Sequence, residues 1–358
     1  MHSDLIRVPA AELESWAAAV LREVGLPEAD AAEVAQHLLF AEMRGLSSHG
    51  LCRLPLYTKR LEAGSMEPVT APEVITETAV SALIDGRNGM GQVVARRAAE
   101  LAAAKAKASG LAAVAVRNSN HCGCLAYYTL LMADQGLVGL ATTNAMPTMV
   151  PHGGREPFFG TNPLSLAAPA GLNAPFVLDM ATSQVARGKI LTAAQAGRAI
   201  PAGWALGRNG DPTTDPLEAL NGLMLPLAGP KGSGLAFMVE ILSGVLPGGQ
   251  IGPQIPRELD RPQGIGHFFL ALRPDLFLPE QEFRQRMDQT IARLRQVEPA
   301  ACERSILLPG EAERLKVAEH ERLGIGLPPS LLAELEELAL RYHLPGPLPG
   351  IAVTADGE

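Results

Sequence analysis

Short runs of β-forming residues alternate with helical patterns after residue 76, and this alternation constrains the fold more than any other feature of the 358-residue chain. Between the first two runs, Val94, Ala98 and Leu101 recur at helical spacing before Gly110, a residue type that commonly ends helices. The alternation predicts a domain of the α/β (or α+β) class over residues 76–300. The runs that we expect to form strands are 82–84, 111–116, 137–142, 164–168 and 176–178.

The two ends of the chain are predicted to be helical instead. Leu13, Trp16 and Val20 follow the spacing of a helix with one buried face, and residues 329–341 repeat that pattern. A further helix is expected to start just before Pro55, because proline is tolerated only in a first helical turn. We therefore predict one helical domain built from both chain ends, residues 1–75 and 301–358.

The composition excludes several classes of partner. Only 19% of the residues are charged, the formal net charge is −8, and no basic tract is present to attract nucleic acid. The start of the chain lacks the layout of a signal peptide, and no apolar run is long enough to span a membrane. We expect a cytoplasmic protein with reduced thiols at its four cysteines, Cys52, Cys122, Cys124 and Cys302.

A glycine-rich turn follows the first expected strand. Residues 86–91, Gly-Arg-Asn-Gly-Met-Gly, resemble the phosphate-binding turn of a Rossmann dinucleotide-binding unit. However, Val94 stands where the third glycine is needed, and no acidic residue follows the next strand at Val116. An ordinary strand-to-helix turn is favoured, and the Rossmann unit remains the alternative.

The segment Ser48-His49-Gly50-Leu51-Cys52-Arg53 approaches the expected helix start and carries two groups suited to acid chemistry. Histidine exchanges protons near neutral pH, and arginine binds a carboxylate through two parallel hydrogen bonds. Both residues are also common as structural groups at a helix edge, so this segment alone does not establish a site.

Polar segments also follow several of the expected strands, where α/β proteins often bind ligands. One contains His121, Cys122, Gly123 and Cys124, a set that raises the alternative of zinc. No second cysteine pair with a common zinc spacing is present, so we expect no metal. Asp179-Met180-Ala181 also follows a strand. Thr161 is expected in a long loop between strands, and Lys231-Gly232 in a polar break before a helix over 235–242.

Several segments together resemble the type-2 malate/L-lactate dehydrogenase family, which includes ureidoglycolate, sulfolactate, diketogulonate and piperideine-carboxylate oxidoreductases. The resemblance rests on SSHGLCRLPLY, NSNHCG, PHGG, FGTNPLS, VLDMATS, ARGKI, GPKGSGLA and LLPGE, in this order along nearly the whole chain. It implies an NAD or NADP cofactor and a cofactor domain that is not a Rossmann fold. It also implies a homodimer in which the helical part of one subunit closes the cofactor site of the other.

The resemblance also assigns roles to individual residues. His49 matches the family's proton donor and acceptor, Ser48 stands beside it in a supporting relay, and Arg53 matches the position that holds the substrate carboxylate. His121 matches a second imidazole at the nicotinamide side, which serves as the acid/base in some members. Thr161 matches a substrate contact. Cofactor contacts are implied for His121, Cys122, Gly123, Asp179, Met180, Ala181, Lys231, Gly232, Pro309, Gly310 and Glu311.

One position departs from part of the family. The imine-reducing members have an acidic residue after the Arg-Gly of ARGKI, whereas this chain has Lys189. A lysine disfavours a cationic imine, so the expected substrate is a small anionic 2-hydroxy or 2-oxo acid. A cyclic imine reductase and a non-catalytic nucleotide-binding relative remain the alternatives.

Overall fold

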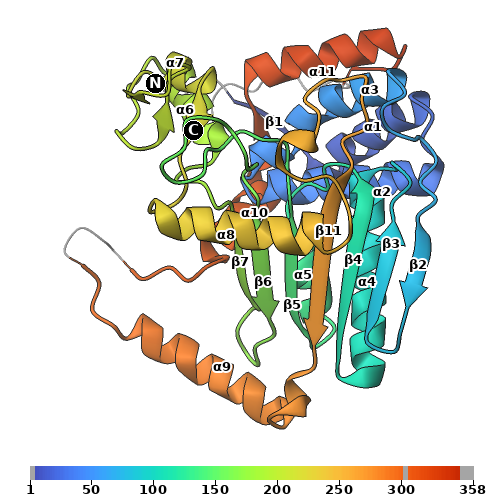
Figure 1. The fold of residues 1–358 in the computed structure, drawn as a ribbon, viewed down its shortest axis with the longest axis vertical. Helices are drawn as coiled ribbons and strands as arrows, with labels where there is room; N and C mark the ends of the chain where they lie inside the picture. The colour runs from blue at the N-terminus through green and yellow to red at the C-terminus, as the bar shows by residue number, and fades with distance from the viewer. Residues whose placement is uncertain (1–4, 301–304, 347–358) are drawn as a thin grey trace.

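A mixed seven-stranded sheet forms the centre of the computed structural model, which describes residues 5–300 and 305–346 (Figure 1). The strand order is β2-β3-β4-β11-β5-β6-β7. The five strands expected from the sequence are confirmed as β3 (Ser81–Asp85), β4 (Leu111–Ser119), β5 (Val138–Thr143), β6 (Leu164–Ala168) and β7 (Phe176–Met180). The sequence analysis missed β2 (Glu73–Glu77) and β11 (Ile265–Leu272).

The connectivity of this sheet is mostly antiparallel. β3 and β4 are its parallel pair, joined by the helix α4 (Gly91–Ser109), and Gly110 ends α4 with φ +92°. β11 runs antiparallel to both β4 and β5 and separates these two strands. A strand from late in the chain therefore completes the sheet between strands from its first half.

Helices cover both faces of the sheet (Figure 1). α4 and α5 (Ala126–Ala133) pack on one face, where the buried side of α4 is a row of alanines that lets it lie close to the strands. α8 (Pro230–Glu240) and a π-helical turn (Ile241–Val245) lie on the other face, across β11. The prediction that Lys231 and Gly232 lie in a polar break before this helix is wrong. α8 begins at Pro230 and includes both residues in its first turn.

The two ends of the chain share one hydrophobic core. α1 (Ala10–Glu23), α2 (Glu28–Met43) and α3 (Leu54–Glu62) pack with α11 (Pro329–Arg341), as the blue and red helices in Figure 1 show. β1 (Ile6–Val8) pairs with β12 (Ile325–Leu327) beside them. Met90 and Val93 from the start of α4 enter the same core, so these helices are packed directly onto the sheet domain.

The remaining elements surround this framework. A small three-stranded sheet carries α6 and α7, and α9 lies apart from the main sheet in Figure 1. The bounds of these elements are β8 (Ala205–Leu206), β9 (Pro212–Thr213), β10 (Leu223–Met224), α6 (Arg187–Gln195), α7 (Pro216–Leu220), α9 (Glu280–Arg295) and α10 (Glu311–Leu323).

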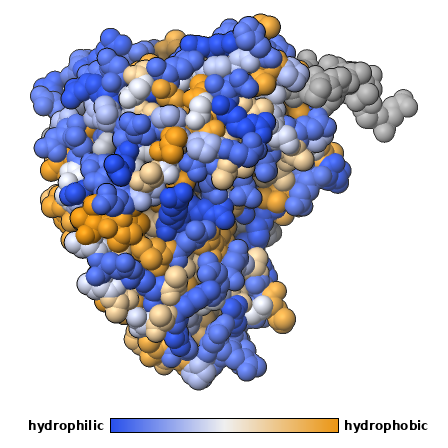
Figure 2. Space-filling model, turned by 90° about the vertical axis from the view of Figure 1, so that its right-hand side faces the viewer, coloured by the Kyte–Doolittle hydropathy of each residue, from blue (hydrophilic) through white to orange (hydrophobic). Residues whose placement is uncertain are grey.

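The surface is polar over most of the face in Figure 2, with apolar side chains in separate groups. Within residues 5–300 and 305–346, no helix has both the length and the apolar character needed to cross a bilayer. One exposed apolar stripe runs along α8 and the π-helical turn. It consists of Phe237, Met238, Ile241, Val245 and Leu246.

Candidate active site

Two short 3-10 turns, Ser47–His49 and Leu51–Arg53, lead into α3 and carry the first group of candidate residues. The Glu42 carboxylate of α2 holds this segment by accepting a hydrogen bond from the Leu51 amide at 2.8 Å. A Cβ at Gly50 would lie 2.2 Å from the same carboxylate, so only glycine permits this approach. Burial raises the pKa of Glu42 to about 7. The segment is therefore fixed to α2 before any ligand binds.

The structure brings His49 and His121 together from opposite parts of the fold. Their rings stack with centroids 5.6 Å apart and planes 25° from parallel. The Ser48 hydroxyl is 2.9 Å from His49 Nδ1, and Arg53 Nε donates to the Ser48 carbonyl at 2.6 Å. Burial, and secondly the charge of Arg53, lower the pKa of His49 to about 3. Burial and Arg53 also place the pKa of His121 well below its usual value. Both imidazoles are therefore neutral at pH 7.

Two residues that the sequence analysis did not single out complete the surroundings of His121. The Tyr57 hydroxyl is 2.7 Å from His121 Nδ1, and Gln92 Nε2 donates to that hydroxyl at 2.8 Å. The Gly123 amide also donates to Nδ1 at 3.3 Å. Tyr57 follows Arg53 by four residues in the helix-forming segment, and this i, i+4 spacing was the signal in the sequence that could have identified it.

The glycine-rich turn supports the His121 segment. A Cβ at Gly91 would lie 2.3 Å from the Asn120 carbonyl oxygen and 2.4 Å from that of His121. A Cβ at Gly89 would lie 2.6 Å from the Thr70 side chain. These glycines allow the start of α4 to pack against the chain's own backbone, which explains why the turn carries part of a dinucleotide-binding pattern.

A cavity of about 900 Å³ lies between α2, α5, β7 and the loop that precedes α10. Three of the residues for which cofactor contacts were predicted line it: Asp179, Pro309 and Gly310. The Asp179 carboxylate accepts a hydrogen bond from the Ala126 amide at 2.7 Å, and burial raises its pKa to about 6. In the described part of the chain, His49 and His121 lie outside the lining of this cavity.

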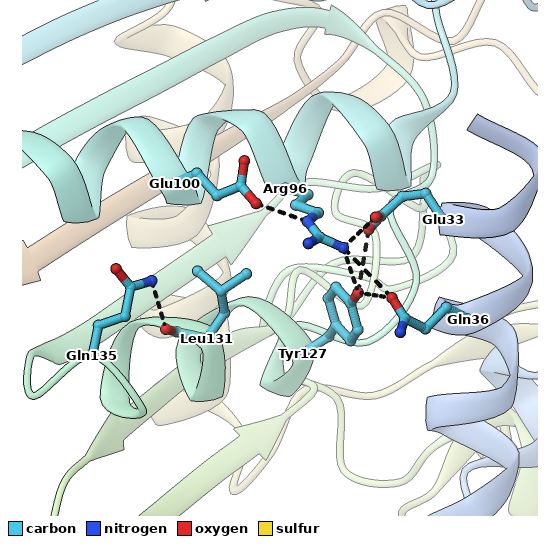
Figure 3. Close-up of polar contacts among 7 residues, drawn as sticks. All are labelled: Glu33, Gln36, Arg96, Glu100, Tyr127, Leu131 and Gln135. Atoms are coloured by element: carbon cyan, nitrogen blue, oxygen red, sulfur yellow. Dashed lines mark hydrogen bonds and ion pairs between the residues drawn. The ribbon is translucent and has the colours of Figure 1, made fainter. Parts of the chain in front are cut away.

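Arg96 joins three helices whose residues line the cavity. Figure 3 shows its guanidinium pointing from α4 toward Glu33 and Gln36 of α2 and toward the Tyr127 hydroxyl of α5. Its Nε also donates to Glu100 at 2.8 Å. Gln36, Arg96 and Tyr127 all line the cavity, so this network holds part of its wall.

The other expected cofactor and substrate contacts are more scattered. The Thr161 carbonyl accepts the Thr182 amide at 2.9 Å, and Glu311 binds the Leu308 amide and Arg295 rather than facing the cavity. Burial raises the pKa of the Cys122 thiol to about 12. Among the described residues, the expected contacts outside the cavity lining are His121, Cys122, Gly123, Thr161, Met180, Ala181, Lys231, Gly232 and Glu311.

The cavity has the chemistry of a nucleotide site. Phe40 and Tyr127 supply aromatic surface, and the Arg44 guanidinium lies 3.5 Å from the Phe40 ring centroid. Aromatic faces and guanidinium groups suit a base and a phosphate, and the volume suits a ligand of that size. These residues therefore fit part of a nicotinamide dinucleotide. Within the described ranges, no group of three or more His, Cys, Asp or Glu residues is placed to hold a metal.

Comparisons with known proteins agree with this geometry. A family model for malate/L-lactate dehydrogenase matches residues 8–336. The chain is 40% identical over 354 residues to a malate dehydrogenase of Pyrococcus horikoshii, covering 97% of this chain and 98% of that protein. It is 39% identical over 321 residues to an L-sulfolactate dehydrogenase of Methanocaldococcus jannaschii, covering 89% and 92%. The solved sulfolactate dehydrogenase from that organism superposes with a TM-score of 0.89 at 37% identity, covering 95% of this chain and 98% of that one.

Proposed function

The chain belongs to the malate/L-lactate dehydrogenase family, and we propose that it transfers a hydride between a nicotinamide cofactor and C2 of a small 2-hydroxy or 2-oxo acid. The observation that carries this proposal is the stacked pair of His49 and His121 with Arg53 beside it. Proton exchange and carboxylate binding are the two tasks that the protein must perform in this reaction.

Each side chain has a task in this proposal. The bound nicotinamide supplies the C4 position that accepts or gives the hydride. His49 is neutral and therefore able to take the proton from the C2 hydroxyl during oxidation, and it returns that proton during reduction. Arg53 holds the substrate carboxylate through its planar fork. That carboxylate offsets the charge of Arg53, which is the second cause, after burial, of the lowered pKa of His49.

The charge around the site favours an anionic substrate over a cyclic imine. The first turn of α6 lies against the active-site segment, because a Cβ at Gly188 would lie 3.5 Å from Ser48 Cβ. Burial and the charges of Arg257 and Arg53 lower the pKa of the neighbouring Arg187. Among the described residues, none of these arginines forms a salt bridge, so their charge is available to a ligand. Lys189 adds to it, and we propose a substrate with a second anionic group.

The cofactor is proposed to bind in the cavity lined by Asp179, Pro309 and Gly310, and not in a Rossmann unit. Asp179, buried beside the start of α5, is positioned to accept a hydrogen bond from an amide or hydroxyl group of the cofactor. The mostly antiparallel sheet and the contact of Gly91 with the Asn120 and His121 carbonyls support this proposal. The space beside Gly89 and Gly91 is filled by other residues of the chain, so no phosphate group fits there.

We further propose that the enzyme is cytoplasmic and forms a homodimer. In each subunit, the helical domain, 1–75 and 301–358, is proposed to be distinct from the cofactor domain. The exposed apolar stripe on α8 supports self-association, since such surfaces are usually covered in an assembly. Light scattering coupled to gel filtration tests this part. A monomeric mass at micromolar concentration contradicts it, and Phe237→Ser is expected to weaken the dimer.

An absorbance assay at the reduced-nicotinamide band tests the function. The panel holds oxaloacetate, sulfopyruvate, pyruvate and piperideine-2-carboxylate, each with NADH and NADPH. We expect the two dianionic oxo acids to give the highest kcat/KM, and Arg187→Gln to reduce their advantage over pyruvate. The highest rate with the cyclic imine supports the alternative reductase, and no turnover of any substrate contradicts the proposal.

A further inference from the structure

We propose that Gly123 and Tyr57 lock the neutral ring of His121 into the tautomer with hydrogen on Nε2. His121 then donates a hydrogen bond to the C2 oxygen of the substrate, and proton exchange falls to His49. This division of roles rests on the proposed function, whereas the tautomer itself is a property of the protein without substrate.

The backbone amide of Gly123 is the first donor to His121 Nδ1. An amide N–H can only donate, so its contact with His121 Nδ1 at 3.3 Å requires a lone pair on that nitrogen. Gly123 has φ +76°, and a Cβ there would lie 2.0 Å from Cε1 of the buried His37 ring. The His37 ring therefore holds this turn in a conformation suited to glycine, with the amide directed at His121.

The hydroxyl of Tyr57 is the second donor to His121 Nδ1. This hydroxyl has a single hydrogen, and it already accepts a hydrogen bond from Gln92 Nε2 at 2.8 Å. Its own hydrogen is then free to be donated to His121 Nδ1 at 2.7 Å. Burial raises the pKa of Tyr57, which keeps the phenol protonated at neutral pH. Two donors thus converge on one nitrogen.

The single hydrogen of the neutral His121 ring is on Nε2. Burial and the charge of Arg53 keep His121 neutral, and a neutral ring has one hydrogen, which must then be on Nε2. Nε2 has no hydrogen-bond partner among the described residues, and it is not among the buried polar atoms that lack one. It is therefore accessible, and it can only donate to a ligand.

His49 differs in the group that contacts its Nδ1. Its partner is the Ser48 hydroxyl at 2.9 Å, which can either donate or accept. The His49 ring can therefore change tautomer when it gains or loses a proton at Nε2. One ring of the stacked pair is switchable and the other is fixed, which separates the acid/base from the hydrogen-bond donor.

The test is nitrogen NMR of the intact protein with ¹⁵N-labelled histidine, without substrate. The signals of His121 are identified by their loss in His121→Gln. We expect a protonated Nε2 and an unprotonated Nδ1 in the native protein, and a partial shift to the other tautomer in Tyr57→Phe. Tyr342→Phe is the control, since it removes a tyrosine hydroxyl whose partner is Glu62, at 2.6 Å, and not a group of the His121 segment. That control is expected to leave the His121 signals unchanged.

Kinetics on the same variants connect the tautomer to turnover. Loss of one hydrogen bond to the ring is expected to lower kcat about tenfold in Tyr57→Phe, with cofactor affinity unchanged. A merely structural Tyr57 would lower the melting temperature without changing the tautomer. A proton on His121 Nδ1 in the native protein overturns the proposal, as does an equal tautomer shift in Tyr342→Phe. Failure of the substrate panel leaves the NMR result standing, so the two failures are distinguishable.

Discussion

Replacing Gly91 with alanine gives the sharpest test of how the glycine-rich turn is used. The added Cβ would lie 2.3 Å from the Asn120 carbonyl oxygen, whereas ordinary contact begins at 3.4 Å. The backbone beside His121 must therefore retreat by about 1 Å, because no side-chain rotation relieves a clash with a carbonyl. Overpacking of this kind costs ~1–3 kcal/mol.

The effect on catalysis is expected to exceed the effect on stability. A displacement of about 1 Å at a reacting group lowers the rate by about 10²-fold, so kcat should fall by this factor. Urea unfolding measures the stability, steady-state assays measure kcat, and tryptophan quenching measures affinity for the reduced cofactor. Gly234→Ala is the control, because a Cβ at that helical position meets nothing within 4 Å.

The opposite pattern would refute this reasoning. If folded Gly91→Ala retained its kcat at saturating cofactor but lost cofactor affinity, the turn would itself bind the dinucleotide. Such a result would restore the Rossmann interpretation of residues 86–91. Equal effects in Gly234→Ala would instead show that any alanine in an α-helix of this protein has the same consequence.

Three other predictions concern single side chains. His49→Gln should lower kcat by ~10²–10⁴-fold while reduced-cofactor binding persists, and near-normal kcat there with collapse in His121→Gln would reverse the two roles. Arg53→Lys should raise KM strongly through loss of the bidentate geometry, and kcat/KM within about twofold in Arg53→Ala would exclude carboxylate binding by this residue. Burial raises the pKa of Glu42 to about 7, so the folded state retains a proton that the unfolded state loses. The stability that Glu42 contributes is therefore complete below about pH 4.5 and is lost as the pH rises through 7. Between pH 5 and pH 8, urea unfolding should show that the free energy of unfolding of Glu42→Gln falls by up to ~3 kcal/mol less than that of the native protein. Parallel pH profiles of the two proteins would contradict the assignment.

Local patterns in the sequence determined much of the secondary structure. The five expected strands, the helix that Gly110 ends and the helical chain ends are all present. The segment from Ser48 to Arg53 was also recognisable, because its residues act within one short stretch of chain. These features depend on side-chain periodicity, on the conformations open to glycine and on the spacing of neighbouring residues.

Tertiary structure decided the arrangement of the sheet and of the site. β11 is an apolar run, which periodicity alone does not assign to a strand, and its place between β4 and β5 depends on pairing with distant residues. The stacking of His49 on His121 and the contact of Tyr57 with His121 join segments that are far apart in sequence. The sequence contains Gly91 but does not show which group lies beside it in space. Only the folded structure shows that backbone carbonyls of Asn120 and His121 fill the space where a side chain would be.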